Sequence, residues 1–341
     1  KDTEYEDLIL RVEGRADGIF TQNEKICIDE IKGVYKNLEL LAEPVLVHRA
    51  QALCYAWIYL DDHGLEEIDV QMTYAHLDTE MIKRFRETMT REELESWYQR
   101  LLDSYHKWLS YQMKWREERN RSMEKLEFPF IYRKGQKEMV AGIYHAISRK
   151  EQIFIQAPTG VGKTMSAVFP AVRSIGEGKA ETLFYLTART ITRTVAQDAF
   201  EILRKNGLLF KTVTITAKEK LCFCEKPECN PETCPYAKGH YDRINDAVYE
   251  LWTNEQSFDR KTILRQAEKW QVCPFEMSLE LSVWMDAVIC DYNYVFDPNV
   301  YLKRFFGENI SGKYLFLIDE AHNLVERGRE MYSASICLED T

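Results

Sequence analysis

The stretch "QIFIQAPTGVGKTMSAVF", residues 152–169, constrains the fold more than any other part of the chain. It predicts a short strand, a glycine-rich loop and the start of a helix, in that order. Gly160 and Gly162 let backbone N–H groups turn inward around phosphates, and Lys163 adds a positive charge. Thr164 offers a hydroxyl to Mg²⁺, and the dipole of the following helix favours an anion. The stretch therefore predicts a nucleotide-phosphate site.

An acidic motif further along the chain is the expected second half of that site. In "YLFLIDEAH", residues 314–322, an apolar run that predicts a buried strand is followed by Asp319 and Glu320. Asp319 would hold Mg²⁺ through its water shell, and Glu320 would orient or activate the attacking water. An exposed acidic helix start is the alternative interpretation, and the phosphate loop upstream makes it the weaker one.

Strand and helix patterns alternate around these two motifs. "TLFYLT" predicts a strand over residues 182–187, and a helix is expected around residues 190–205. The alternation breaks at residues 218–275 and resumes with the strand pattern of residues 286–296. Such an order is typical of an α/β fold, in which helices cover both faces of a parallel sheet.

These motifs resemble those of superfamily 2 helicases, and in detail those of the XPD and DinG branch. "YRKGQ" places Arg133 and Gln136 where this branch reads the adenine. "YLTARTITRTVAQ" looks like the motif that grips a DNA strand, through Thr187, Arg189 and Thr190. A solvated helix start is the alternative for that second stretch. "CDYNYVF" also resembles a segment of this branch that precedes the acidic motif.

The resemblance covers residues 128–341 and implies a RecA-like motor domain that uses ATP and Mg²⁺. Its first part would span residues 128–217 and its second part residues 281–341, with an iron-sulfur domain inserted at residues 218–280. The implied partner is single-stranded or tailed duplex DNA, and the implied polarity is 5′ to 3′. The second motor domain is expected to be absent, because the chain ends soon after the acidic motif. We therefore expect residues 1–341 alone to be a poor ATPase.

The stretch "KLCFCEKPECNPETCPY", residues 220–236, concentrates four of the nine cysteines. No signal peptide opens the chain, so reduced cytosolic thiols are expected and metal ligation is favoured over disulfides. Four thiolates suit either Zn²⁺ or a 4Fe-4S cluster. The stretch has no C-x₂-C pair of the kind usual in zinc ribbons, which favours a cluster closed by a distant ligand, and zinc remains the alternative.

The helicase resemblance implies which cysteines hold the cluster. "KLC" at Cys222 resembles the opening ligand of the family and "CPF" at Cys273 the closing one, which assigns the ligands as Cys222, Cys229, Cys234 and Cys273. Cys224 is then spare and is the plausible substitute. The remaining thiols lie in apolar contexts and are expected in the core: Cys27, Cys54, Cys290 and Cys337.

The N-terminal region predicts a hairpin with three polar groups on it. "LILRVEGRADGIF" and "KICIDEIKG" read as two strands that carry Asp17, Glu30 and Lys32. Glu30 and Lys32 share one strand face, so a carboxylate and an ammonium can converge on a metal held by Asp17. Two acids can bind Mg²⁺ or Mn²⁺ while a lysine steadies charge near a scissile phosphate. A cross-strand salt bridge on a solvated face is the alternative.

The segment after this hairpin strengthens the metal-site interpretation. A helix is expected over residues 45–64, followed by a strand over residues 67–77. Gln51 and Tyr55 fall on one face of that helix and resemble the Q-x₃-Y motif of RecB-like PD-(D/E)XK nucleases. The resemblance implies an N-terminally incomplete nuclease domain at residues 1–80 and a Mg²⁺- or Mn²⁺-dependent deoxyribonuclease. Residues 81–127 are expected to form a helical connector.

Composition limits the remaining choices. No apolar run is long enough to cross a bilayer, and the net charge of −10 permits only a local cationic groove for nucleic acid. The expected location is cytoplasmic and nucleoid-associated, in repair, recombination or defence. Two alternatives stay open, an ATP-gated DNA clamp with an inactive nuclease fold and an RNA-directed motor.

Overall fold

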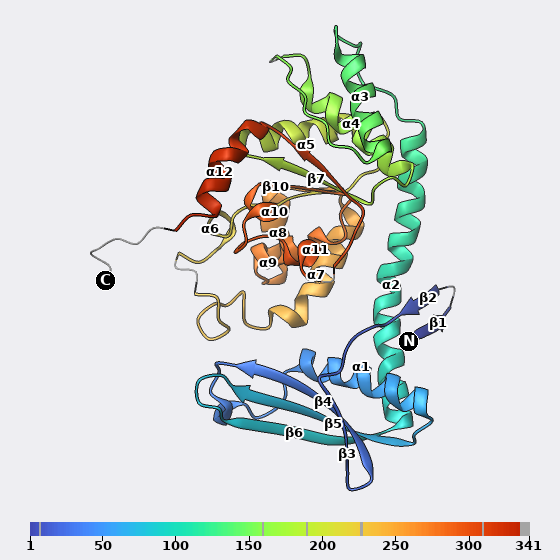
Figure 1. Ribbon diagram of the computed structural model, residues 1–341, viewed down its shortest axis with the longest axis vertical. Coiled ribbons are helices and arrows are strands. Elements are labelled where there is room, and N and C mark those ends of the chain that lie inside the picture. The colour runs from blue at the N-terminus through green and yellow to red at the C-terminus, as the bar shows by residue number, and fades with distance from the viewer. Residues whose placement is uncertain (7, 159, 189, 226–227, 309, 335–341) are drawn as a thin grey trace, which may run out of the picture. The chain divides into compact units, whose positions relative to one another are not determined.

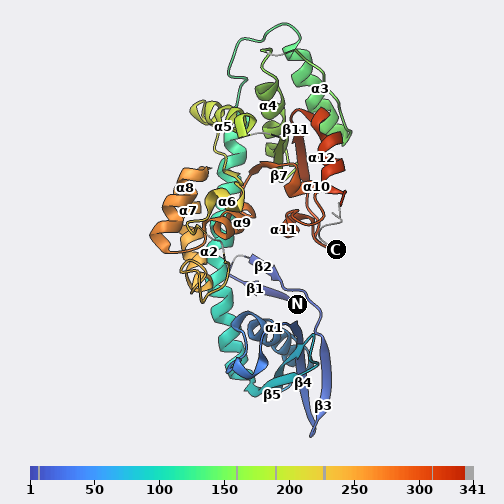
Figure 2. The ribbon, with the colours of Figure 1, turned by 90° about the vertical axis from the view of Figure 1, so that its left-hand side faces the viewer.

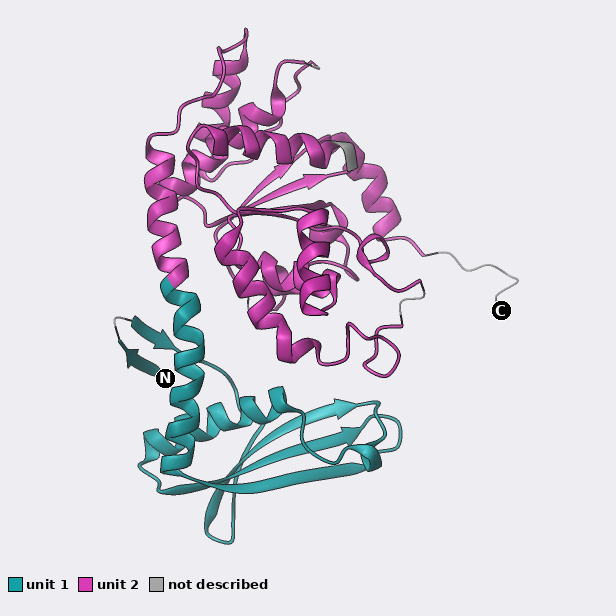
Figure 3. Ribbon diagram, turned by 180° about the vertical axis from the view of Figure 1, so that it is seen from behind, with its two compact units in different colours: residues 1–110 teal, residues 111–341 magenta. Residues whose placement is uncertain are grey.

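The computed structural model describes residues 1–6, 8–158, 160–188, 190–225, 228–308 and 310–334. The chain divides into two compact units, Lys1–Ser110 and Tyr111–Thr341, each built around its own sheet (Figure 3). None of the helices in these described ranges combines the length and the apolar character needed to cross a membrane.

Unit 1 contains a four-stranded mixed sheet in the order β3-β4-β5-β6. Its strands are β3 (Gly18–Gln22), β4 (Lys25–Val34), β5 (Glu67–His76) and β6 (Ile82–Thr90). The β4 and β5 strands are parallel, and the outer pairs are antiparallel. Helix α1 (Leu46–His63) connects β4 to β5 and runs along one face of the sheet (Figures 1 and 2). The unit also contains a separate hairpin of β1 (Asp2–Tyr5) and β2 (Leu8–Arg11), the short helix η1 (Leu38–Leu40) and the first part of helix α2 (Arg91–Glu124).

Helix α1 confirms the prediction made for residues 45–64. One face of it is buried against the sheet through Ala52, Leu53, Ala56, Trp57 and Leu60. The helix ends at Gly64, whose φ of 64° is left-handed and therefore favours glycine. The Gly64 N–H donates to carbonyls of the last turn, which satisfies part of the helix end.

The strand predicted over residues 8–20 is wrong as a single element. It divides into β2 and β3, with residues 12–17 outside any strand. Gly14 passes so close to α1 that a Cβ atom there would lie 2.5 Å from the ring of Tyr55. Asp17 accepts a hydrogen bond from the backbone N–H of Ile31 through its side chain at 2.9 Å. Residues 12–17 therefore pass close to α1 and do not extend the pairing of β3 with β4.

The helical connector predicted to begin at residue 81 is also corrected. Residues 82–90 form β6, which pairs with β5 along its whole length, so the sheet continues past the predicted boundary at residue 80. Alternate residues of β6 are half-buried, and its charged side chains lie on both faces. So many charged residues are typical of exposed helices as well as of edge strands. The alternation of half-buried and exposed residues at every second position was therefore not recognised in the sequence. Helix α2 (Arg91–Glu124) follows directly.

Unit 2 contains a parallel sheet, as predicted. Its strand order is β11-β7-β10-β8-β9. Its strands are β7 (Thr182–Thr187), β8 (Thr212–Thr214), β9 (Ser257–Phe258), β10 (Ala287–Asp291) and β11 (Tyr314–Ile318). The longer helices are α3 (Gln136–Arg149), α4 (Lys163–Gly176), α5 (Thr190–Lys205), α7 (His240–Asn254), α8 (Arg260–Trp270), α9 (Pro274–Ser282) and α12 (Leu324–Met331). The short ones are α6 (Lys218–Leu221), α10 (Asn293–Phe296), α11 (Lys303–Phe306) and η2 (Ala321–Asn323).

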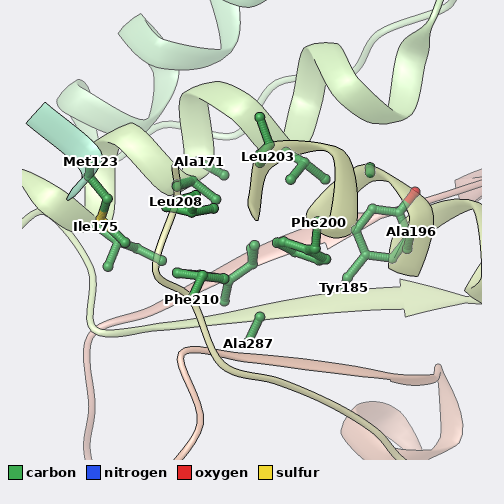
Figure 4. Packing of buried hydrophobic residues seen from close by; sticks show 14 of the residues in the cluster. Met123, Ala171, Ile175, Tyr185, Ala196, Phe200, Leu203, Leu208, Phe210 and Ala287 are labelled. Atoms are coloured by element: carbon green, nitrogen blue, oxygen red, sulfur yellow. The ribbon is translucent and has the colours of Figure 1, made fainter. Parts of the chain in front are cut away.

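The core of unit 2 lies between this sheet and the helices α4 and α5. Figure 4 shows Phe200 and Leu203 of α5 facing Tyr185 and Phe210 across this layer. The rings of Phe200 and Phe210 stack with their centroids 5.5 Å apart. Such close packing determines the distance between the sheet and the helices α4 and α5. It therefore also determines the position of the loop that precedes α4.

The strand predicted over residues 152–156 is not formed. Ile153, Phe154 and Ile155 are exposed, Phe154 by 87%, and lie outside any strand. Among the described residues, β11 pairs only with β7, so its other edge is free. A short apolar run becomes a strand only when its N–H and C=O groups find a partner strand, and no such ladder forms here.

A buried ion pair joins the end of α2 to the sheet of unit 2. Asp286, which is 3% exposed, accepts hydrogen bonds from Arg119 Nη1 at 2.6 Å, Trp115 Nε1 at 3.0 Å and Lys211 N at 2.7 Å. Removing one partner leaves the other charge buried and unpaired. We expect Asp286→Ala to lower the free energy of unfolding of unit 2 by about 3–5 kcal/mol.

Urea denaturation followed by tryptophan fluorescence measures this effect. Arg121→Ala is the matched control, because Arg121 and Glu117 form an exposed i,i+4 pair on the same helix. Such a pair contributes about 0.3–0.5 kcal/mol. Equal effects of the two substitutions would contradict the importance of the buried pair.

Candidate functional site

The phosphate loop has the backbone that its glycines predict. Gly160 and Gly162 have φ angles of 83° and 81°, in the left-handed region, and α4 begins at Lys163. A Cβ atom on Gly162 would lie 2.7 Å from Gln136 Nε2. Glycine is therefore required at this position both by the backbone conformation and by the close approach of the Gln136 side chain.

Arg133 and Gln136 both lie against this loop. The Arg133 guanidinium donates to the carbonyl of Gly160, and the Arg133 N–H donates to Gln136 Oε1 at 3.0 Å. A cavity of about 380 Å³ opens beside them, lined in part by Gln136, Ala157 and Val161. The residues predicted to read an adenine are thus next to the residues predicted to bind its phosphates.

The acidic motif reaches the same place from the end of β11. Lys163 Nζ lies 4.0 Å from Glu320 Oε1. The Tyr185 hydroxyl donates to Asp319 Oδ2 at 3.2 Å, and Thr164 is hydrogen-bonded to the same hydroxyl. All four predicted residues of the loop and the motif therefore meet at one edge of the sheet. A hydroxyl and two carboxylates beside an ammonium are the donor set that Mg²⁺ and a nucleotide phosphate require.

Two buried tyrosines of this site were missed by sequence reasoning. Tyr185, on β7, is 2% exposed, and burial raises its pKa well above the usual range. Tyr292 follows β10 and is fully buried, and burial raises its pKa to about 12. Both hydroxyls stay protonated and can donate hydrogen bonds to the acidic motif. Tyr185 is a polar-tipped aromatic inside an apolar strand pattern, and Tyr292 lies in the stretch "CDYNYVF", but neither hydroxyl was assigned a role from the sequence.

The predicted strand-gripping residues are described only in part. Thr187 is the last residue of β7 and is buried. Arg189 and the side chain of Thr190 lie outside the described residues, while the backbone of Thr190 begins α5. Arg193, one turn into α5, was not predicted and contacts the sheet through Ile215 O at 3.3 Å.

The cysteines fall into two groups. Cys224 Sγ lies 4.0 Å from Cys234 Sγ, and Cys224 is also hydrogen-bonded to Cys222. Lys218 is hydrogen-bonded to Cys229 and lies near Cys273, the residue before α9. Burial raises the pKa of the Cys273 thiol. In the described part of the chain, no three His, Cys, Asp or Glu side chains gather as a metal site.

The four predicted ligands Cys222, Cys229, Cys234 and Cys273 are therefore not brought around one point, and the iron-sulfur cluster stays a prediction. Cys224, predicted to be spare, is the thiol in contact with Cys234.

The thiols predicted in the core are placed as follows. Cys27 and Cys290 are fully buried, Cys54 is half-buried, and Cys337 lies outside the described residues.

A second polar cluster lies in unit 1, between β4 and α1. Lys32 Nζ donates to Glu30 Oε1 and to Gln51 Oε1, the latter at 3.3 Å. Gln51 Nε2 in turn donates to the hydroxyl of Tyr55 at 3.3 Å. The helix places Gln51 and Tyr55 one turn apart, so all four predicted residues form one continuous chain of contacts.

Asp17 completes this cluster from the segment before β3. Its carboxylate lies near that of Glu30 and accepts a hydrogen bond from Ile31 N. Burial raises the pKa of Glu30, Lys32 opposes that shift, and the Asp17 charge adds to it. Glu30 is 1% exposed, and its Oε2 has no hydrogen-bond partner among the described residues. A buried carboxylate oxygen with no partner, next to a second carboxylate, fits a divalent cation.

Family models match the nucleotide-binding part of unit 2. Residues 133–229 match the family described as "DEAD/DEAH box helicase", and residues 205–340 match the family described as "DEAD_2". These matches support a superfamily 2 helicase motor domain over this part of the chain.

Individual proteins are similar to parts of this chain. "Regulator of telomere elongation helicase 1 homolog" of Caenorhabditis briggsae is 23% identical over 266 residues, covering 64% of this chain and 26% of that protein. "Fanconi anemia group J protein homolog" of Gallus gallus is 31% identical over 106 residues, covering 31% of this chain and 8% of that protein. The solved structure "Truncated XPD" is 20% identical, covers 56% of this chain and 52% of that chain, and has a TM-score of 0.38. The chain spans about a quarter or less of the length of these curated relatives.

Proposed function

We propose that unit 2 is the ATP-binding half of a DNA motor of the XPD and DinG type, with 5′-to-3′ polarity. The observation that carries this proposal is the meeting of Lys163 with Glu320 and of Thr164 with Asp319 through the Tyr185 hydroxyl. A phosphate loop and an acidic motif serve nucleotide hydrolysis only when they converge in this way.

The residues of the site have separate roles in hydrolysis. Lys163 and the backbone N–H groups of the loop bind the phosphates, and Arg133 with Gln136 binds the adenine. Thr164 and Asp319 would hold Mg²⁺, which neutralises charge that develops on the phosphates. Glu320 orients the attacking water and accepts its proton. Hydrolysis would then drive translocation along a strand held by Thr187, Arg189 and Thr190.

The nucleic-acid partner is single-stranded or tailed duplex DNA in this proposal, and the setting is repair, recombination or defence at the nucleoid. Comparing the ATPase rates with single-stranded DNA and with RNA of the same sequence tests it. An RNA-directed motor would respond more to RNA, and an ATP-gated clamp would respond to DNA without separating its strands.

We also propose that unit 1, with the sheet and α1 of residues 1–90, is a PD-(D/E)XK nuclease domain. Support comes from the contact chain of Glu30, Lys32, Gln51 and Tyr55, and from the unpartnered Glu30 Oε2. Asp17 and Glu30 would hold Mg²⁺ or Mn²⁺, which activates water for attack on a phosphodiester. Lys32 would orient that water and stabilise the charge of the transition state.

An iron-sulfur cluster at residues 218–280 is the third part of the proposal, supported by five thiols that come from this segment alone. Anaerobically purified protein is expected to be coloured, with about four iron atoms per chain. Cys229→Ser and Cys273→Ser should each remove most of the iron. The iron content of Cys224→Ser tests whether Cys224 is a ligand. The assignment from sequence predicts that the iron is retained, whereas the Cys224–Cys234 contact predicts that it is lost. Stoichiometric zinc in a colourless protein would contradict the cluster.

A further inference from the structure

The backbone of the acidic turn is held by one buried hydroxyl. Tyr292 Oη donates to the carbonyl of Asp319 and lies 3.1 Å from the carbonyl of Glu320. Tyr292 is fully buried, so no water competes for these acceptors. The Glu320 carbonyl is also an acceptor of η2, so the tyrosine holds the turn together with that helix.

Glu320 needs such support because its backbone is in an unfavourable conformation. Its φ of 52° is left-handed, which costs a residue with a Cβ atom about 1–2 kcal/mol. Asn323 adds two hydrogen bonds to the Glu320 carbonyl, from its side chain at 3.0 Å and its backbone N–H at 2.9 Å. The conformation of the residue that orients the water is thus imposed by its neighbours.

The residue next to Tyr292 connects two helices that border the site. Asp291 Oδ2 lies 3.7 Å from Arg193 Nη2 on α5, and Asp291 Oδ1 lies 3.1 Å from Arg327 Nη2 on α12. Asn293 Oδ1 accepts a second bond from Arg327 at 3.0 Å. The Nε groups of Arg193 and Arg327 are buried and find no acceptor among the described residues. Two guanidinium groups thus share one carboxylate, and neither is fully satisfied.

We infer that residues 291–293 are a relay that couples strand binding at α5 to the position of Glu320. The inference rests on the proposed motor function and assigns to it two positioning residues, Asp291 and Tyr292. A strand phosphate that draws Arg193 away from Asp291 changes the partners of the carboxylate. Tyr292 directly follows Asp291, and its hydroxyl contacts the carbonyls of Asp319 and Glu320. A shift of Asp291 therefore moves the hydroxyl that holds those carbonyls.

Two substitutions test the two ends of this relay in the complete protein. Tyr292→Phe removes one hydroxyl and keeps the ring, so it should lower kcat for ATP about tenfold with KM for ATP within about twofold. Asp291→Asn should lower the ratio of DNA-stimulated to basal hydrolysis about fivefold. Tyr294→Phe removes a hydroxyl from the same segment and should leave both quantities unchanged.

If Asp291 and Tyr292 only stabilise the fold, the two substitutions would lower the melting temperature and reduce the basal and DNA-stimulated rates by the same factor. That result would overturn the relay. The relay is also overturned if Lys163→Ala is inactive while Tyr292→Phe and Asp291→Asn behave like Tyr294→Phe. If instead the unsubstituted protein and Lys163→Ala hydrolyse ATP equally, the proposed motor function itself fails, whatever Tyr292 does.

Discussion

Lys163→Ala is expected to lower the rate of ATP hydrolysis by at least about a hundredfold. Lys163 is the first residue of α4, and its ammonium lies 4.0 Å from the carboxylate of Glu320. The substitution removes the one side-chain cation that the loop directs at the phosphates, while a helix-favouring residue keeps α4 intact. Steady-state phosphate release with saturating single-stranded DNA measures the effect.

Lys205→Ala is the matched control for this substitution. Lys205 is exposed at the end of α5 and takes no part in the site. We expect its ATPase rate to equal that of the unsubstituted protein. A Lys163→Ala protein that retained most of the rate would show that the phosphate loop is not the hydrolysis site.

Lys32→Ala is expected to abolish Mn²⁺-dependent cutting of DNA and to leave ATP hydrolysis unchanged. Lys32 contacts both Glu30 and Gln51, so it stands at the centre of the unit 1 cluster. Loss of a group that stabilises transition-state charge lowers a rate by about a hundredfold or more. Lys25→Ala is the control, because Lys25 lies on the same strand and forms only an exposed pair with Glu67.

Binding of the metal can be tested separately from cutting. Burial raises the pKa of Glu30 in spite of Lys32, so a divalent cation beside it would further favour its charged form. We therefore expect Mn²⁺ to raise the melting temperature of the unsubstituted protein and of Lys25→Ala, but not of Glu30→Gln. Stabilisation without cutting would identify an inactive nuclease fold that clamps DNA. Cutting that survives in Lys32→Ala would come from another site or a contaminant.

Local motifs identified residues that the structure brings together, because each motif depends on a few adjacent residues. The loop around Gly162 and the turn at Asp319 require no knowledge of distant parts of the chain. The turn at Asp319 follows β11, and the packing of α4 on the sheet brings the loop to it, although residues 152–156 form no strand. The contact between Gln51 and Lys32 likewise follows from the position of α1 along the face of the sheet that carries Lys32.

Features that depend on partners distant in sequence were not predictable. Four of the nine residues in 82–90 are charged, and the pairing with β5 identifies the segment as a strand. Residues 152–156 have the composition of a strand and lack a partner ladder. Tyr292 acquires its role from two carbonyls that come 27 and 28 residues later, so no local pattern could reveal it.

The central claim is that unit 2 is a motor driven by ATP and responsive to a DNA strand. The most direct measurement is the ATPase rate of the complete protein with and without single-stranded DNA, with Lys163→Ala assayed in parallel. We predict a rate at least about tenfold higher with DNA, more stimulation by DNA than by RNA, and no stimulation in Lys163→Ala. A rate that is unchanged by DNA, or that survives in Lys163→Ala, would contradict the account.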